Sequence, residues 1–205
     1  MRIISGNLKG KKILSPKNEL TRPLKDLTKE SIFNLIKHSK LLDCKLENAN
    51  VLDLFAGVGS FGLECLSRGA QSVTFFENYK EALIILKENI SSMKQQNFSE
   101  VIDKNIFLEN TFKYLNKKYD IIFMDPPYKE KKVPDILNKI IKLNLLKENG
   151  VIIIHRHKKE KDLFPKEFKI IISKIYGRLK RKKLFSLHLI PMGKHLLKGL
   201  DLNNI

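Results

Sequence analysis

The sequence predicts an α/β fold in which a mostly parallel, seven-stranded sheet is covered by helices on both faces. Two observations predict it. From residue 51 onward, short apolar runs of strand length alternate with segments of helical periodicity. Glycines at 57–62 make a tight turn between the first apolar run and its helix. Such alternation is typical of a sheet whose strands are buried on both sides.

The segment before residue 46 is expected to form a small N-terminal hairpin-and-helix extension. The stretches RIISG (2–6) and KGKKIL (9–14) turn around glycines, which predicts the hairpin. KESIFNLIKH (29–38) places its apolar residues on one helical face, which predicts the helix.

The alternating part of the chain predicts the sheet itself. The expected strands are 51–56, 72–77, 105–110, 119–125, 149–155, 168–176 and 183–190. The expected helices are 60–69, 79–90 and 134–146. The basic turn GRLKRKK joins the last two strands, so we expect them to close the sheet as a hairpin.

Composition points to a folded protein of a reducing compartment. The length of 205 residues fits one domain with a small extension, and 42% hydrophobic residues support a real core. Two cysteines make a disulfide framework improbable. No apolar run approaches the roughly 20 residues of a membrane span, and the start lacks a signal-like core. We expect a soluble, cytoplasmic protein that does not act at a membrane.

Positive charge is concentrated at the two ends of the chain. The net charge of +17 divides into +6 over residues 1–50, −2 over 51–128 and +13 over 129–205. A near-neutral middle between basic flanks favours a central chemical site with surfaces that bind a polyanion, and nucleic acid is preferred over a membrane.

The stretch DLFAGVGSFG (53–62) indicates a nucleoside cofactor. Gly57, Gly59 and Gly62 have G-x-G-x-x-G spacing, and Glu77 ends the next expected strand 20 residues after Gly57. Such glycines let the backbone come close to a ligand, and the acidic group can accept hydrogen bonds from ribose hydroxyls. Asp53 would repel a pyrophosphate but attract an amino group. This favours S-adenosylmethionine over NAD.

The run IIFMDPPY (121–128) ends an apolar strand in a rigid polar motif. Proline cannot continue a ladder and holds the preceding residue extended. DLFAGVGSFG followed by DPPY resembles the class I (Rossmann-like) methyltransferases that modify exocyclic amino groups. The resemblance implies that the Asp125 carboxylate and the Pro126 carbonyl accept hydrogen bonds from the amino group of a target base, and that Tyr128 stacks on that base.

The N-terminal stretches MRIISGNLKGKKI and TRPLKDLTKESIFN resemble the bacterial 16S ribosomal RNA guanine-N2 methyltransferases. The resemblance covers about residues 1–190. It implies methyl transfer to the 2-amino group of one guanine, on assembled or partly assembled 30S subunits. It also implies a methyltransferase domain at 46–190 after the 1–45 extension, with residues 191–205 as an unassigned tail. We expect a monomer.

The resemblance also implies site residues. The cofactor is expected at Asp53, Phe55, Ala56, Gly57, Gly59, Glu77, Asn78, Asn110 and Thr111. The target base is expected at Asp125, Pro126, Pro127 and Tyr128. Contacts with RNA are expected from Arg22, Lys29, Arg156, Arg178, Lys180, Arg181, Lys182 and Lys183. The stretch HRHK (155–158) stands where the family often has glutamate. Its HxH spacing has no third ligand nearby, so no metal is expected.

Other functions remain open at this point. A DNA adenine-N6 methyltransferase or a protein-glutamine methyltransferase would hold its target amino or amide group with a motif similar to DPPY, here called the clamp. A noncatalytic RNA-binding assembly factor on the same fold is a further alternative. Little chain remains after Tyr128 for a DNA-recognition region, and the basic flanks disfavour a protein substrate.

Overall fold

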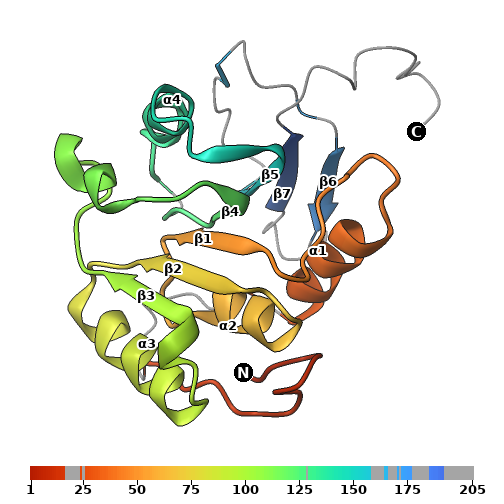
Figure 1. Ribbon diagram of the computed structural model, residues 1–205, viewed down its shortest axis with the longest axis vertical. Helices are drawn as coiled ribbons and strands as arrows, with labels where there is room; N and C mark the ends of the chain where they lie inside the picture. The colour runs from red at the N-terminus through yellow and green to blue at the C-terminus, as the bar shows by residue number, and fades with distance from the viewer. Residues whose placement is uncertain are drawn as a thin grey trace.

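The described strands of a computed structural model form one seven-stranded sheet with the order β3-β2-β1-β4-β5-β7-β6 (Figure 1). The structure describes residues 1–16, 24, 26–127, 129–157, 164–165, 170, 172–176 and 185–191. The strands are β1 (Asn50–Leu54), β2 (Ser72–Phe76), β3 (Ser99–Ile102), β4 (Tyr119–Met124), β5 (Leu146–His157), β6 (Ile172–Tyr176) and β7 (Phe185–Pro191). Strands β1 to β5 are parallel, whereas β7 runs antiparallel to both β5 and β6.

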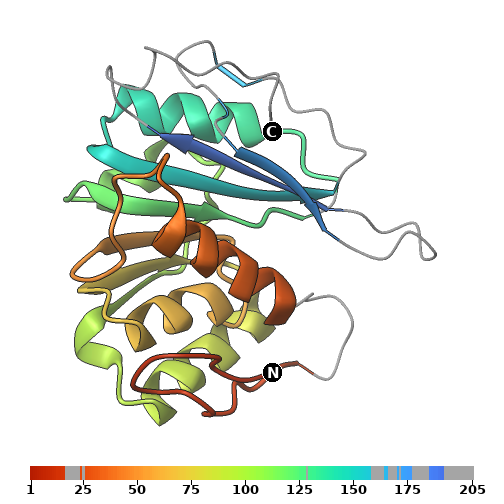
Figure 2. The ribbon, with the colours of Figure 1, turned by 90° about the vertical axis from the view of Figure 1, so that its right-hand side faces the viewer.

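Helices cover both faces of the sheet, as predicted. They are α1 (Asp26–His38), α2 (Ser60–Ser67), α3 (Lys80–Ser92) and α4 (Val133–Lys142), with the 3-10 helices η1 (Gln96–Phe98) and η2 (Glu109–Tyr114). Helices α1, α2 and α3 lie on one side of the sheet, and α4 lies on the other (Figure 2). None of the described helices is both long and apolar enough to cross a bilayer.

Two apolar cores lie on the two faces of the sheet because neighbouring residues of a strand point to opposite sides. In β1, Val51 belongs to the core under α1 to α3, whereas Leu52 belongs to the core under α4. In β4, Phe123 and Met124 divide in the same way. The continuous apolar runs of the sequence are therefore strands buried on both sides.

Residues 1–14, here called the N-terminal segment, are attached to the helices by side chains. An isolated antiparallel bridge joins Arg2 and Lys12, so the segment has hairpin pairing at one point instead of two regular strands. Buried Glu64 of α2 accepts the backbone N–H groups of Ile4 (2.8 Å) and Ser5 (3.0 Å). On α3, the Asn89 Oδ1 atom accepts the N–H of Leu14 at 2.8 Å, and its Nδ2 atom donates back to the Leu14 carbonyl at 3.1 Å.

The prediction of a strand at 105–110 is wrong. The third strand is the more polar stretch Ser99–Ile102, which pairs in parallel with β2. Residues 105–110 instead form a turn that leads into η2. Asn105 drives this turn because its Oδ1 atom accepts the N–H of Phe107 at 2.9 Å, which is a local alternative to a ladder.

The closing hairpin is confirmed in the described strands, since β6 and β7 pair antiparallel from Ile172–Leu189 to Tyr176–Phe185. The basic turn at 177–183 and the tail beyond 191 lie outside the described residues.

Candidate active site

The ends of β1, β2 and β4 lie level with one another and with Ile154 inside β5. Leu54, the last residue of β1, pairs with Phe76 of β2 and Met124 of β4, and Met124 in turn pairs with Ile154 of β5. The positions that come next along these four strands are Phe55, Glu77, Asp125 and His155. They meet where the strand order reverses between β1 and β4, and open α/β sheets bind their ligands at such a point.

Asp53 is a buried carboxylate with an oxygen that no described residue satisfies. Its side chain is 1% exposed, and its Oδ2 atom accepts the N–H of Gly62 at 3.0 Å. Within the described residues, its Oδ1 atom has no hydrogen-bond partner. Burial raises the pKa of Asp53 well above its ordinary value, and the negative charges of Asp125 and Glu77 add to the shift. A buried acceptor of this kind fits a ligand that brings a donor or a positive charge.

Gly57 in the glycine loop between β1 and α2, and Gly62 in the helix that follows, are required for different structural reasons. Gly57 has φ +56, and a Cβ added there would meet nothing within 4 Å, so the loop faces open space at this point. Gly62 lies inside α2, where an added Cβ would come within 2.2 Å of Cε1 of Phe75. The first glycine therefore leaves room for a ligand, and the last one lets the helix pack on the sheet.

Glu77 ties the end of β2 to the glycine loop. Its Oε2 atom accepts the N–H of Gly57 at 2.7 Å, and its Oε1 atom accepts the N–H of Tyr79 at 2.7 Å. Burial raises the pKa of Glu77, although these backbone hydrogen bonds oppose the shift. The carboxylate, which also accepts a backbone hydrogen bond from Asn78, thus ties the glycine loop to the end of β2.

The other residues expected at the cofactor lie near this edge but differ in exposure. Ala56 is buried in the loop, and Asn78 after β2 is exposed. Asn110 is exposed in η2, while the buried Thr111 donates its hydroxyl to the Asn105 carbonyl at 2.6 Å. The Thr111 side chain is therefore occupied within its own loop.

Phe55, expected at the cofactor, pairs with a second aromatic residue, Phe107, that was not predicted from the sequence. Phe55, which adopts the unusual φ of 64°, lies with its ring centroid 5.9 Å from that of Phe107. Phe107 precedes η2 and is half-buried, so the two rings form an apolar wall beside Glu77. The signal was the apolar pair at 106–107, which was assigned to a strand instead.

The DPP motif directly follows β4, and β5 supports it from the side. The Asp125 Oδ1 atom lies 2.9 Å from Nδ1 of His155. Arg156 donates from Nη2 to the Glu130 carbonyl at 2.7 Å and from Nη1 to the Pro127 carbonyl at 3.4 Å. Pro126 is buried and Pro127 is exposed, while Tyr128 lies outside the described residues.

Two of the residues expected to bind RNA are buried. The Lys29 side chain is 0% exposed, donates to the Arg2 carbonyl at 2.9 Å and lies 3.3 Å from an oxygen of Asp26. Desolvation lowers its pKa, while Glu64 and Asp26 oppose the shift. Arg156 is 2% exposed and engaged as described above. Burial of this extent is incompatible with the expected phosphate contacts, because both cations hold backbone carbonyls inside the protein.

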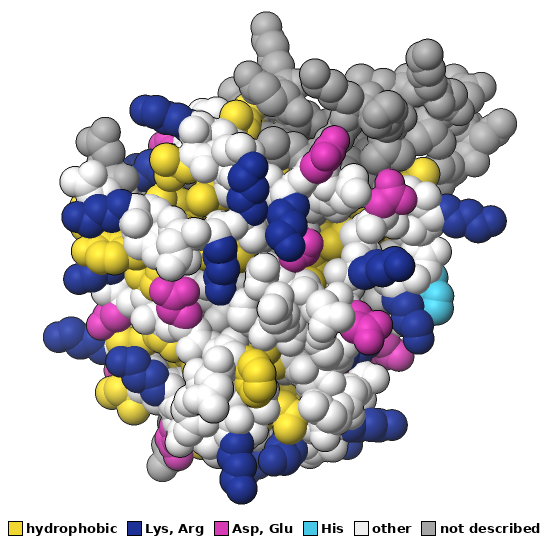
Figure 3. Space-filling model, viewed as in Figure 1, with side chains coloured by type: hydrophobic (Ala, Val, Ile, Leu, Met, Phe, Trp, Pro, Cys, Tyr) yellow, Lys and Arg dark blue, Asp and Glu magenta, His cyan; other side chains and the backbone are white. Residues whose placement is uncertain are grey.

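The remaining expected RNA contacts, Arg22, Arg178, Lys180, Arg181, Lys182 and Lys183, lie outside the described residues. Exposed Lys129, Lys131 and Lys132 follow the DPPY motif directly and were not singled out from the sequence. On the face seen in Figure 3, lysine and arginine side chains are spread among acidic and apolar ones.

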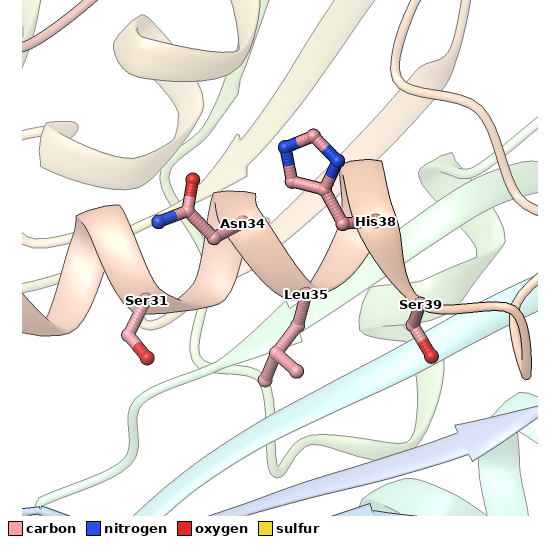
Figure 4. Close-up of a pocket in the computed structure, with 5 residues that line it drawn as sticks. All are labelled: Ser31, Asn34, Leu35, His38 and Ser39. Carbon is pink, nitrogen blue, oxygen red and sulfur yellow. The ribbon is translucent and has the colours of Figure 1, made fainter.

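A hollow along α1 does not have the features of a reaction site. It is lined by Ser31, Asn34, Leu35, His38 and Ser39. Asn34 and His38 project from one side of the helix and Leu35 from the other, so the polar groups do not converge (Figure 4). Among the described residues, no group of three or more His, Cys, Asp or Glu side chains is placed to hold a metal ion.

The sequence and the fold match known proteins over most of their length. The family model "Conserved hypothetical protein 95" matches residues 1–183. Ribosomal RNA small subunit methyltransferase D of Buchnera aphidicola (subsp. Acyrthosiphon pisum) is 36% identical over 177 residues, which is 86% of this chain and 88% of the relative. The protein of the same name from Haemophilus influenzae is 32% identical over 181 residues, covering 86% and 89%.

Among solved structures, HI0767 from Haemophilus influenzae superposes with a TM-score of 0.70 and 28% identity, covering 94% of this chain and 98% of that one. Together with the relatives, this structure places the chain in the methyltransferase-like α/β class that the sequence predicts.

Proposed function

The chain belongs to the conserved hypothetical protein 95 family, together with the ribosomal RNA small subunit methyltransferase D proteins, and we propose that it methylates the exocyclic N2 amino group of one guanine in 16S ribosomal RNA. It is an rRNA methyltransferase that uses S-adenosylmethionine. The observation that carries the proposal is the meeting of Asp53, Glu77 and Asp125 at the reversal point of the sheet.

The residues at this edge fit S-adenosylmethionine. The buried Oδ1 atom of Asp53 needs a donor, and the amino group of the methionyl part is a suitable one. Open space beside Gly57 leaves room for the ligand at the loop, and the half-exposed Glu77 carboxylate can accept a hydrogen bond from a ribose hydroxyl. When bound, the cofactor supplies an electrophilic methyl group on a sulfonium. The Phe55–Phe107 wall would pack beside the nucleoside.

Asp125 and Pro126 are proposed to hold the target amino group. The lone pair of an amino nitrogen is delocalised into the base, so attack requires the nitrogen to become more tetrahedral. Acceptors placed at the two amino hydrogens favour that geometry. The carbonyl of Pro127 is already engaged by Arg156 and Glu130, so we assign the second acceptor to the carbonyl of Pro126.

The target guanine must leave its helix or loop to reach this edge. Stacking on Tyr128 would contribute about 1–3 kcal/mol to holding it there. In-line placement of the amino nitrogen can contribute up to about 7–11 kcal/mol to lowering the barrier. After transfer, the alkylated amine is acidic, and its proton leaves to Asp125 or to water.

Small-subunit rRNA within assembled or partly assembled 30S particles is the proposed partner of a monomeric enzyme. The exposed Lys129, Lys131 and Lys132 follow the clamp and would contact the phosphates that flank the target. Each phosphate neutralised adds about −0.7 to −0.9 to the slope of log K against log salt concentration, so binding should weaken steeply with salt.

The test is transfer of tritiated methyl groups from S-adenosylmethionine into unmethylated small subunits, followed by nucleoside analysis. We expect N2-methylguanosine from the wild type, only a small residual amount from Asp125→Ala, and unchanged product from the control Asp135→Ala, which alters an exposed residue of α4. Label in adenine or in protein would refute guanine as the target. Cofactor binding without label in subunits, naked rRNA or DNA would favour a noncatalytic assembly factor.

A further inference from the structure

His155 contacts the carboxylate of the proposed clamp directly. The register of β4 with β5 pairs Met124 with Ile154, so Asp125 and His155 are the next positions on neighbouring strands. Their Oδ1 and Nδ1 atoms lie 2.9 Å apart, and the two side chains are 27% and 9% exposed. This distance fits a hydrogen bond between an imidazole N–H and a carboxylate oxygen.

Consecutive residues of β5 support the motif from two sides. Neighbouring residues of a strand point to opposite faces, so His155 and Arg156 approach the DPP motif from different directions. His155 reaches the Asp125 carboxylate, while Arg156 holds the carbonyls of Pro127 and Glu130. Arg156 fixes the backbone that carries the motif, but it does not control rotation of the Asp125 carboxylate. His155 is placed to do so.

We propose that His155 is a positioning residue for methyl transfer: its Nδ1–H group holds Oδ1 of Asp125, so that Oδ2 is directed at the target amino group. The proposal rests on the proposed function and adds to it the residue that orients the clamp. A carboxylate turns freely about its terminal bond unless one oxygen is held, and a misplaced acceptor loses transition-state stabilisation.

The charges around the pair favour this arrangement. Asp53 lies close enough to Asp125 for their negative charges to repel each other. A donor on one Asp125 oxygen offsets part of that repulsion without removing the carboxylate. In the same way, the histidines and carboxylates that bind metals are oriented by hydrogen bonds from behind, and losing such a partner typically lowers metal affinity or activity about 10- to 100-fold.

The kinetic test compares His155→Leu with His155→Asn. Leucine has no donor, whereas the asparagine amide can place an N–H close to the position of Nδ1. We expect His155→Leu to lower kcat about 10- to 100-fold with unchanged cofactor affinity, and His155→Asn to restore most of the loss. His38→Leu, on the hollow of α1, is the matched control and should keep wild-type kcat. Equal activity of wild type and His155→Leu would overturn the proposal while leaving the proposed function intact.

A double variant tests whether His155 acts through Asp125. On the Asp125→Ala background, adding His155→Leu should reduce the residual activity no further. A second loss as large as the first would mean that His155 acts on the base or on the fold instead, and would also overturn the proposal.

A spectroscopic measurement tests the pair even if guanine methylation is not detected. Nitrogen-15 NMR of the imidazole should find Nδ1 of His155 protonated in the wild type, and should find that preference lost in Asp125→Ala. A bare Nδ1 in the wild type would leave two lone pairs facing each other and would refute the pairing. An absence of methyl transfer, by contrast, would refute the proposed function alone.

Discussion

Replacing Asp53 by asparagine should stabilise the ligand-free protein while weakening its hold on S-adenosylmethionine. The carboxylate is buried, and its Oδ1 atom has no partner among the described residues. Desolvating an ionised group costs several kcal/mol even after relaxation. The amide of Asp53→Asn would keep the Gly62 hydrogen bond and leave a neutral N–H pair unsatisfied, which costs about 1–3 kcal/mol. The charge penalty is larger, so the variant should gain about 1–3 kcal/mol at alkaline pH.

The pH dependence gives the sharper form of this prediction. The pKa of Asp53 is raised in the folded protein from an ordinary value of 3.8. The folded state therefore keeps a proton that the unfolded state has lost, and wild-type stability falls as pH rises from that ordinary value through the raised one. Below this window Asp53 is protonated in both states. The advantage of Asp53→Asn should thus be larger at pH 8.5 than at pH 4.5.

Urea unfolding at the two pH values measures the stability, and calorimetry with S-adenosylmethionine measures the affinity. Losing a charged partner for the ligand amino group costs about 1.5–3 kcal/mol, which predicts roughly 10- to 100-fold weaker binding. Asp135→Asn, in the exposed first turn of α4, is the control and should show a small loss at pH 8.5 instead of a gain. A lower stability of Asp53→Asn at pH 8.5 would refute the reasoning.

Three further predictions concern packing and burial. Gly62→Ala should lower the free energy of unfolding by about 1–3 kcal/mol, because the new Cβ would meet Phe75 at 2.2 Å. Urea unfolding measures this loss, and an equally stable variant would contradict the contact. Glu64→Gln should cost about 3–5 kcal/mol, because it removes the charge that pairs with Arg68 at 2.7 Å and with buried Lys29 at 3.9 Å. It should also speed amide exchange in the N-terminal segment, whose backbone N–H groups donate to the carboxylate, and unchanged exchange would argue against the anchor. Burial raises the pKa of Cys44 to about 12, so its thiol should react slowly with a disulfide reagent at pH 8 until urea unfolds the protein. Rapid reaction of the folded protein would disprove the burial of Cys44.

Much of the fold follows from local patterns in the sequence. The apolar runs of β1, β2, β4 and β5 could be recognised because strands covered on both faces carry little polar alternation. The grouping of Asp53, Glu77 and Asp125 also followed, since the carboxyl ends of parallel strands meet at one edge.

The errors arose where a local pattern competed with tertiary structure. The edge strand Ser99–Ile102 is partly exposed and polar, so it gave no apolar signal. Residues 105–110 looked like a strand, but the Asn105 side chain forms a turn there. Lys29 looked like a surface cation, because nothing in α1 reveals that Glu64 of another helix lies 3.9 Å from its ammonium group.

The contacts of His155 could not be predicted for the same kind of reason. Its partner depends on the register between β4 and β5, which is set by how the strands pair and not by the residues around it. From the sequence, HRHK offers only a basic stretch at the end of a strand.

The way in which the N-terminal segment is held has a consequence for synthesis. Its partners lie far along the chain: Glu64 follows Ile4 by 60 residues, and Asn89 follows Leu14 by 75. At about 5–20 residues per second, the ribosome needs roughly 4–15 s to add the residues between Leu14 and Asn89. The first residues to emerge therefore wait without their anchors while β1, α2 and β2 are made. Docking of this segment should be completed only after β1, α2, β2 and α3 have been made, while the central strand β4 follows later in the chain.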